Sequence, residues 1–128
     1  MFLMNPRPCP KILIVEDLRS LAESCAACLR VISTCVEIVG DGESALAALH
    51  RVQPDIILLD VNLPDMSGID LLRRVRQSGI ASDVIVMTGE GSIRLAVEAM
   101  RSGARDFLVK PFGIERLRQS VAHALHLK

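Results

Sequence analysis

Five short apolar runs recur along the chain, and longer segments of mixed polarity separate them. Four of the runs are nearly continuous and rich in branched residues, which is typical of strands that are covered on both faces. The second run alternates more, with Glu37 inside it, and suits an edge strand. The runs are 12–15, 36–39, 56–59, 84–87 and 107–109.

The segments between the runs repeat their apolar residues at helical spacing. Asp41, Gly42 and Glu43 start the second segment, and Gly103 closes the fourth as a left-handed cap would. Strict alternation of strands and helices predicts a parallel sheet with helices on both faces. The inward stripes we expect are Leu21, Cys25, Cys28 and Ile32; Ala45, Leu46 and Leu49; Ile69, Leu72 and Val75; Ala96, Val97 and Met100; and Ile114, Leu117, Val121 and Leu125.

The composition corresponds to one folded domain of ordinary charge. The chain has 128 residues, half of them hydrophobic, which excludes intrinsic disorder. Lys plus Arg and Asp plus Glu both number 15, so a nucleic-acid module held by bulk positive charge is disfavoured. Arg73, Arg74 and Arg76 are therefore expected on a solvated helix face. The absence of Trp and Tyr removes a stacking platform for single strands.

The ends of the chain carry no membrane or export pattern. No apolar run approaches the roughly 18–20 residues that cross a bilayer. The start lacks the charged and then apolar pattern of a secretory signal. We therefore expect a cytoplasmic protein without membrane contact. Pro6, Pro8 and Pro10 lie near the start, so we expect residues 1–10 to form a flexible arm and 11–126 to form the domain.

Four cysteines occur, at positions 9, 25, 28 and 35. Cys25 and Cys28 have the spacing of a redox or metal motif. The same two residues fall on the inward stripe of the first helix, and no second pair is present to complete a zinc site. We therefore favour free thiols that pack in the core as small hydrophobic side chains.

Polar residues follow the apolar runs. Glu16 and Asp17 come after the first run, Asp60 after the third, Thr88 after the fourth and Lys110 after the fifth. Parallel strands all point the same way, so their carboxyl ends meet at one edge of the sheet, where ligands of open α/β sheets bind. Three carboxylates, a hydroxyl and an ammonium group are therefore predicted to converge.

This combination favours phosphoryl chemistry assisted by a metal ion. Three carboxylates repel one another unless a cation compensates them, and Mg²⁺ prefers carboxylate, phosphate and water oxygens. Lys110 and Thr88 are suited to phosphoryl oxygens, and an Asp carboxylate can form an acyl phosphate. Each residue alone has an ordinary alternative: Asp17 and Thr88 as helix caps, Lys110 as a solvated surface group.

With these residues, the chain resembles the receiver domains of two-component response regulators, over about residues 11–126. The resemblance implies a doubly wound (βα)5 fold of the flavodoxin-like and CheY-like type. This fold is a three-layer sandwich with a parallel five-stranded sheet in the order 2-1-3-4-5. The segments that carry the resemblance are 15–17, 60–64 with Gly68, Thr88 with Gly89, and 107–112.

The resemblance implies a role for each of the acidic residues at the carboxyl ends of the strands and for two residues near them. Asp60 accepts the phosphoryl group from a phosphohistidine. Asp17 binds Mg²⁺ (or Mn²⁺) directly, Glu16 acts nearby, Asp60 shares the metal, and Asn62 adds a backbone carbonyl. Asn62 and Glu90 tune how fast water removes the phosphoryl group.

The resemblance also implies a switch. Thr88 and Lys110 hold the phosphoryl oxygens, and the bond from Lys110 to Pro111 is expected to be cis. Phe107 stands at the position of the family's switch aromatic. Because Phe has no hydroxyl, a change in its position could be transmitted only through packing. A structural role in the core remains the alternative for Phe107. The surface of the fourth helix, fifth strand and fifth helix would change shape, with Leu95, Met100 and Arg101 as candidates on it.

Two other classes of protein remain as alternatives. A phosphatase of the haloacid-dehalogenase type also uses an Asp at a strand end, but it wants a second Asp where Asn62 stands. A nucleotide- or flavin-binding module has the same architecture, but the loop after the first strand has no Gly fingerprint. We therefore expect a switch that supports its own phosphotransfer and slow autodephosphorylation, not an enzyme with a separate substrate.

The resemblance also implies the partners. A sensor histidine kinase or a phosphotransfer protein is expected to supply the phosphoryl group. A homodimer through the surface of the fourth helix, fifth strand and fifth helix is possible in this family. No direct contact of this domain with nucleic acid is expected.

Overall fold

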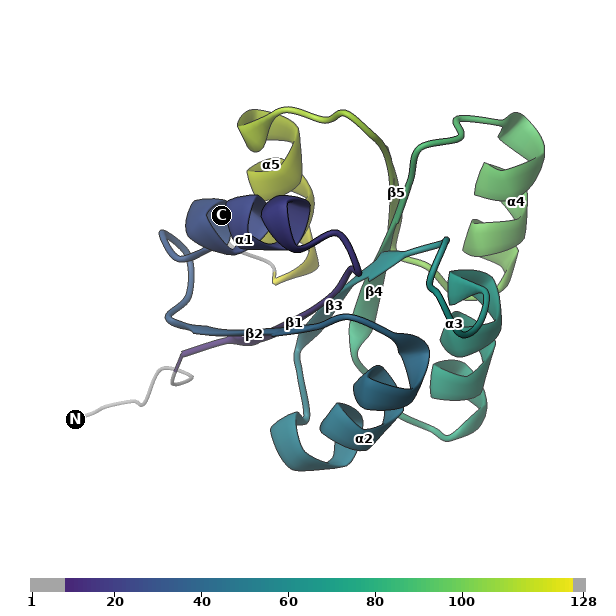
Figure 1. The fold of residues 1–128 in the computed structure, drawn as a ribbon, viewed down its shortest axis with the longest axis horizontal. Helices are drawn as coiled ribbons and strands as arrows, with labels where there is room; N and C mark the ends of the chain where they lie inside the picture. Colours follow the sequence, from purple (N-terminus) through teal and green to yellow (C-terminus); the bar gives the residue numbers. More distant parts are fainter. Residues whose placement is uncertain (1–8, 126–128) are drawn as a thin grey trace.

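The computed structural model describes residues 9–125, and five parallel strands and five helices alternate along that range. The sheet order is β2-β1-β3-β4-β5, so the predicted fold class and order are confirmed. Figure 1 shows the five helices around the twisted sheet. The elements are β1 (Lys11–Val15), α1 (Arg19–Leu29), β2 (Cys35–Val39), α2 (Gly42–Val52), β3 (Ile56–Asp60), α3 (Gly68–Gln77), β4 (Asp83–Thr88), α4 (Ile93–Arg101), β5 (Asp106–Val109) and α5 (Ile114–Ala124).

The sheet separates two hydrophobic clusters, because successive side chains of a strand point to opposite faces. Leu13 and Leu59 belong to the cluster under α2, α3 and α4. Ile14 and Leu58, their neighbours in sequence, belong to the cluster under α1 and α5. The central strands β1, β3 and β4 are therefore buried on both faces, as their continuous apolar runs predict.

Three of the helices begin at a side chain that accepts a backbone N–H. Asp41 accepts from Ser44 at 2.7 Å at the start of α2. Ser67 accepts from Ile69 at 3.1 Å before α3, and Ser92 accepts from Leu95 at the same distance before α4. These bonds satisfy donors that have no partner inside the helix. The predicted start of α2 is confirmed, and so is the left-handed Gly103 after α4, with φ of +106°.

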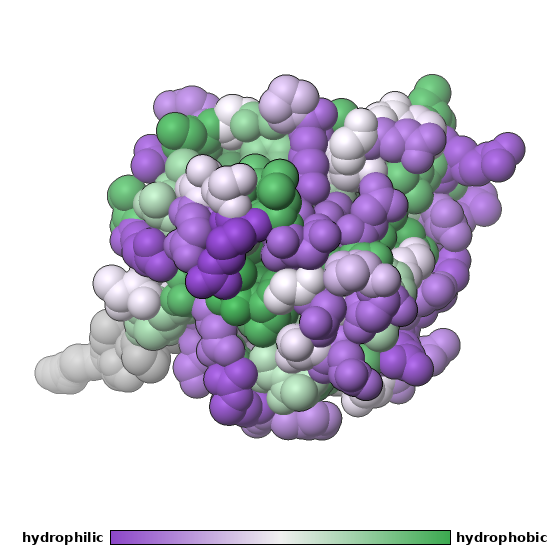
Figure 2. Space-filling model, in the orientation of Figure 1, coloured by the Kyte–Doolittle hydropathy of each residue, from purple (hydrophilic) through white to green (hydrophobic). Residues whose placement is uncertain are grey.

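The predicted inward stripe of α4 is wrong. Ala99 is its only fully buried residue, with Leu95 half-buried one turn earlier, whereas Val97 and Met100 are exposed. The helix lies beside β5, a four-residue strand at the edge of the sheet, so it has little surface to cover. Apolar side chains among hydrophilic ones are visible on that side of the molecule in Figure 2.

Three smaller expectations also need correction. On α5, Ile114 is exposed while Leu117 and Val121 are buried. On α1, the buried stripe is Ala22, Cys25, Ala26 and Leu29, and Leu21 and Cys28 lie at its margin. The fifth apolar run is not covered on both faces, since β5 is the second edge strand and its last residue, Val109, is exposed.

Arg76 does not point into solvent as expected. Its guanidinium donates to the carbonyl of Ile80 at 2.9 Å, to that of Gly103 at 3.3 Å, and to that of Ser82. The side chain thus ties the turn after α3 to the turn after α4. Arg73 and Arg74 are exposed, as the charge pattern indicates.

The predicted arm, 1–10, lies mostly outside the described residues, as does the end of the predicted domain at 126. Within the described part, Cys9 and Pro10 contact the main domain: Ser33 donates its hydroxyl proton to the carbonyl of Pro10, and the Cys9 thiol lies 3.2 Å from the same hydroxyl. Among the helices of residues 9–125, none has the length and apolar character needed to cross a membrane.

Candidate phosphoacceptor site

The carboxyl ends of four neighbouring strands bring the predicted polar residues to one edge of the sheet. Glu16 and Asp17 follow β1, and Asp60 is the last residue of β3. Thr88 ends β4, and Lys110 follows β5. All five come together as parallel geometry predicts.

The three acidic residues are close enough to share one cation. One carboxylate oxygen from each of Glu16, Asp17 and Asp60 lies within 4.8 Å of the other two. Glu16 and Asp60 are buried, whereas Asp17 is exposed. Asp17 does not cap α1, because Leu18 occupies the N-cap position and no side chain caps the helix. The capping alternative for Asp17 is therefore wrong, and its carboxylate faces the cluster.

Lys110 partly neutralises the two buried acids. Its Nζ lies 2.8 Å from Oε1 of Glu16 and 3.3 Å from Oδ1 of Asp60. Burial lowers the pKa of Lys110, but the hydrogen bond and charge of Glu16 and the charge of Asp60 outweigh it, so the pKa is raised. Burial raises the pKa of Glu16, and Lys110 opposes that shift only in part. One ammonium facing three carboxylates leaves an excess of negative charge at this edge.

The backbone holds Asp60 in place. The N–H of Val61 donates to the carbonyl of Met87 at 2.9 Å, which continues the pairing of β3 with β4 past Asp60. The N–H of Asn62 donates to Oδ1 of Asp60 at 3.2 Å. Gly68 packs against the same turn so closely that an added Cβ would lie 2.2 Å from the carbonyl oxygen of Asp60. Only glycine fits there without moving the backbone that carries Asp60.

Thr88 is fully buried beside this cluster. Its hydroxyl accepts the N–H of Glu90 at 3.0 Å, which orders the first turn of the loop to α4. Its carbonyl accepts the N–H of Lys110 at 2.7 Å, so the backbones of the two predicted phosphoryl-binding residues are hydrogen-bonded to each other. Asn62 and Glu90 are exposed at the rim.

Phe107 lies within β5, and Pro111 follows that strand two residues after its end. Phe107 is half-buried and packs against the cluster under α2, α3 and α4, which also includes Leu95. The peptide bond between Lys110 and Pro111 is cis, as the resemblance implies. Phe107 thus has the packing role left open by the sequence, on a strand that contacts α4.

The donor set fits a hard divalent cation. Three carboxylates, two of them buried, place their oxygens close enough to bind one ion, and oxygen ligands are the type that Mg²⁺ and Mn²⁺ prefer. Sulfur and imidazole are absent from the cluster, which disfavours zinc. The residues present can therefore hold a magnesium ion.

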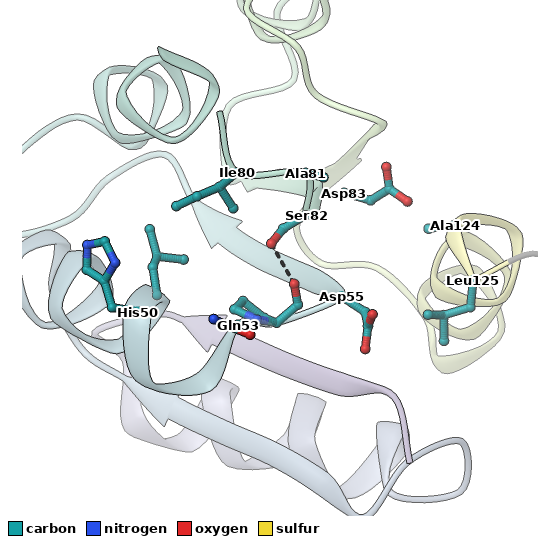
Figure 3. Close-up of a pocket in the computed structure, with 11 residues that line it drawn as sticks. His50, Gln53, Asp55, Ile80, Ala81, Ser82, Asp83, Ala124 and Leu125 are labelled. Atoms are coloured by element: carbon teal, nitrogen blue, oxygen red, sulfur yellow. Dashed lines mark hydrogen bonds between the residues drawn. The ribbon is translucent and has the colours of Figure 1, made fainter. Parts of the chain in front are cut away.

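A cavity at the other end of the sheet takes no part in this site. It has a volume of about 470 Å³ and is shown in Figure 3. Its lining includes His50, Gln53, Asp55 and Asp83, from the loops that enter β3 and β4 and from their neighbours. The volume of a cavity therefore does not identify the site in this protein, because the predicted polar residues lie at the opposite edge of the sheet.

Comparison with known proteins agrees with this site. The family model for the response regulator receiver domain matches residues 12–122. The regulatory protein LuxO of Vibrio cholerae is 44% identical over 112 residues, which is 88% of this chain and 25% of that protein. The transcriptional regulatory protein TrcR of Mycobacterium tuberculosis is 34% identical over 122 residues, 92% of this chain and 48% of TrcR. The chain belongs to the receiver-domain family of two-component response regulators.

Solved structures support the same assignment. The receiver domain of a LuxO repressor protein from Vibrio parahaemolyticus superposes with a TM-score of 0.88 at 40% identity, covering 91% of this chain and 90% of that one. A CheY-like receiver domain from Methanospirillum hungatei gives a TM-score of 0.86 at 27% identity, covering 92% and 94%. None of these matches supports the phosphatase alternative. The chain spans about a quarter of the length of the LuxO relatives.

Proposed function

We propose that Asp60 is the phosphoacceptor of this receiver domain. A carboxylate oxygen of Asp60 attacks the phosphorus of a phosphohistidine, the P–N bond breaks, and the imidazole leaves. The observation that carries the proposal is the position of Asp60: buried, 3.3 Å from Lys110 and within reach of both Glu16 and Asp17. Acyl phosphate formation needs such a carboxylate among groups that compensate charge on the transferred phosphoryl.

Glu16, Asp17 and Asp60 are proposed to hold Mg²⁺ (or Mn²⁺), with the backbone carbonyl of Asn62 as a further ligand. The bound ion supplies positive charge to the phosphoryl oxygens. Lys110 supplies the second positive charge and already faces Asp60. The Thr88 hydroxyl carries one proton and is proposed to turn from its present contact with the Glu90 N–H toward a phosphoryl oxygen.

The switch follows from these movements. Phosphorylation adds roughly −1.5 to −2 charges at pH 7, which draws Thr88 and Lys110 inward. The loop that carries Gly89, Glu90 and Gly91 is proposed to follow, since two glycines give its backbone a wide choice of conformations. Phe107, half-buried beside it, is proposed to turn inward and change the face made by α4, β5 and α5. Asn62 and Glu90, exposed at the rim, are proposed to set the rate at which water reaches the phosphoaspartate.

The proposed partners are a sensor histidine kinase or a phosphotransfer protein as donor. A second copy of the chain is proposed to bind the face of α4, β5 and α5 after phosphorylation. Apolar side chains stand exposed on this face, namely Ile93, Val97, Met100, Val109 and Ile114. Residues 11–126 are proposed to be the unit that performs the switch, following the arm at 1–10.

Phosphorylation by a small phosphodonor with Mg²⁺ tests the assignment. Intact-protein mass spectrometry is expected to show one added phosphoryl group on the wild type and none on Asp60→Asn. Asp83→Asn, at the far end of β4, is the matched control and is expected to be labelled like the wild type. If Asp60→Asn is labelled as fully as the wild type while its circular dichroism spectrum is unchanged, the proposal is wrong.

A further inference from the structure

Four polar or sulfur-bearing residues gather where β1 and β2 begin, at the edge of the sheet away from the acidic cluster. Cys9 lies just before β1, and Ser33, Thr34 and Cys35 lead into β2. Lys11 is in register with Cys35. The chain bends at Cys9, which brings its thiol over the start of the neighbouring strand.

The Cys9 sulfur is surrounded by hydrogen-bonding groups. Its Sγ lies 3.2 Å from the hydroxyl oxygen of Thr34 and accepts the backbone N–H of Thr34 at the same distance. It also contacts the Ser33 hydroxyl at 3.2 Å, and the thiol of Cys35, the residue after Thr34, lies near enough for the two thiols to shift each other's pKa. The Ser33 proton goes to the carbonyl of Pro10, so Thr34 and Cys35 are the donors left for a thiolate.

These contacts make the two thiols unequal. Contacts with the side chains of Cys35, Ser33 and Thr34 lower the pKa of Cys9 to about 6, whereas the contact with Cys9 raises the pKa of Cys35. A thiolate is the nucleophilic form of cysteine, so Cys9 is the reactive member at neutral pH. By contrast, burial raises the pKa of Cys25 to about 11, which leaves that thiol inert.

A small oxidant can reach the pair. Cys35 is exposed, and Cys9 is half-buried. A shallow hollow of about 300 Å³, lined by Thr34, Cys35 and Arg51 among others, opens beside β2. The sequence motif that suggested redox chemistry, Cys25 with Cys28, lies instead on α1 with Cys25 buried in the core.

We propose that Cys9 and Cys35 are a peroxide-sensitive pair that closes a disulfide between the segment ahead of β1 and the first residue of β2. The Cys9 thiolate attacks one oxygen of hydrogen peroxide. The O–O bond breaks, leaving a sulfenic acid on Cys9 and a hydroxide that takes up a proton to become water. The Cys35 sulfur then attacks the Cys9 sulfur, the S–O bond breaks, and a second water leaves. Two thiols and one peroxide thus give one disulfide and two waters.

Mass spectrometry after treatment of the full chain with dilute peroxide tests the pairing. The wild type is expected to lose two hydrogens, and a non-reducing peptide map is expected to link Cys9 to Cys35. Cys35→Ser keeps a hydroxyl donor beside Cys9, so it is expected to stop at a sulfenic acid on Cys9 that dimedone captures. Cys28→Ser, at the margin of α1, is the matched control and is expected to form the disulfide as the wild type does.

Two further measurements make the result decisive. The pH dependence of iodoacetamide alkylation at Cys9 is expected to have its midpoint near the lowered pKa in Cys35→Ser and higher in Cys35→Ala, which removes the donor. The disulfide closes a loop that contains all of α1, so oxidation is expected to raise Tm by about 5–10 °C. The proposal is overturned if peroxide links other cysteines or links none. It is also overturned if dimedone captures as much sulfenic acid in Cys9→Ser as in Cys35→Ser.

Discussion

Asp106, the first residue of β5, shows how one side chain ties a strand to a helix within the face made by α4, β5 and α5. Arg116 of α5 donates to both of its oxygens, at 3.0 and 3.1 Å, and Ser120 donates to Oδ2 at 2.6 Å. The backbone N–H of Phe107 donates to Oδ1 at 2.8 Å. Burial raises the pKa of Asp106, but these hydrogen bonds outweigh it and hold the pKa below its usual value.

The Asp106→Asn variant is expected to lose about 1–2 kcal/mol of unfolding free energy at pH 7, because an uncharged amide is a weaker acceptor for Arg116. The lowered pKa fixes the sign of the pH dependence: the carboxylate stabilises the fold above its ordinary pKa of 3.8 and ceases to do so as pH falls through the folded value. Urea unfolding at several pH values should therefore show the gap between wild type and variant closing in acid. A gap that is constant with pH would contradict this account.

At this scale, the sequence predicts residues whose position follows from backbone direction alone. Glu16, Asp60 and Thr88 fall at strand ends, and parallel strands bring their ends together whatever else the chain does. Asp106 with Arg116, and Arg76 with the carbonyl of Gly103, pair residues 10 and 27 positions apart. Such pairs depend on how a helix sits against its neighbour, which periodicity does not specify.

Among the elements, the turn between β3 and α3 sets the position of Asp60, the proposed phosphoacceptor. The N–H of Gly68 donates to the carbonyl of Val61 at 2.7 Å, so the first turn of α3 closes back on the end of β3. A Cβ at position 68 would also lie 2.8 Å from the Cα of Val61. The contacts are with backbone, which cannot move aside as a side-chain end can.

Gly68→Ala is therefore expected to lower the free energy of unfolding by about 2–3 kcal/mol and to slow phosphorylation of Asp60. Gly89→Ala is the matched control for stability, since a Cβ there meets no atom within 4 Å. Its unfolding free energy should stay within about 0.5 kcal/mol of the wild type. Urea unfolding and labelling by a phosphodonor measure the two effects, and equal stability of both variants would refute the steric argument.

The face of α4 gives the second prediction at this scale. Val97 and Met100 are exposed and line a shallow hollow of about 380 Å³, so phosphorylation that reshapes this face is expected to promote dimers. Val97→Arg should remain monomeric after phosphorylation, as judged by sedimentation. Val31→Arg, at an apolar position after α1 that is more exposed than Val97, should dimerise like the wild type. Dimers of phosphorylated Val97→Arg would rule out this interface.

The α4 stripe also marks the limit of periodicity. The spacing of apolar residues identifies the helix and its end at Gly103 correctly. Which side of the helix is buried depends on how much of the sheet lies beneath it, and the strand beneath α4, β5, is only four residues long. The same cause explains Val109: an apolar run does not reveal whether a strand lies at the centre or at the edge of the sheet.

Across the whole molecule, a formal net charge of zero hides a strongly uneven distribution. Strand alternation predicts the parallel sheet, whereas the strand order came from the resemblance to receiver domains and the structure confirms it. That order places β1 between β2 and β3, so Glu16 and Asp17 stand next to Asp60. The cluster carries three carboxylates against one ammonium, and the balancing positive charges lie elsewhere.

This imbalance predicts opposite effects of one substitution with and without metal. Asp17→Asn removes one of three mutually repelling charges, so in EDTA it is expected to unfold at a higher temperature than the wild type. Added Mg²⁺ at about ten times its Kd is expected to stabilise the wild type by about 1.4 kcal/mol, or roughly 4 °C in Tm, and to do much less for Asp17→Asn.

Thermal unfolding followed by circular dichroism, with and without Mg²⁺ at matched ionic strength, measures both effects. Glu23→Gln, which removes an exposed carboxylate of α1 that pairs with Arg19 at 3.0 Å, is the control for charge loss outside the cluster. It should respond to Mg²⁺ as the wild type does. If Asp17→Asn gains as much from Mg²⁺ as the wild type, the acidic cluster is not the metal site. If it gains less but is no more stable in EDTA, repulsion among the three carboxylates is not what the ion relieves.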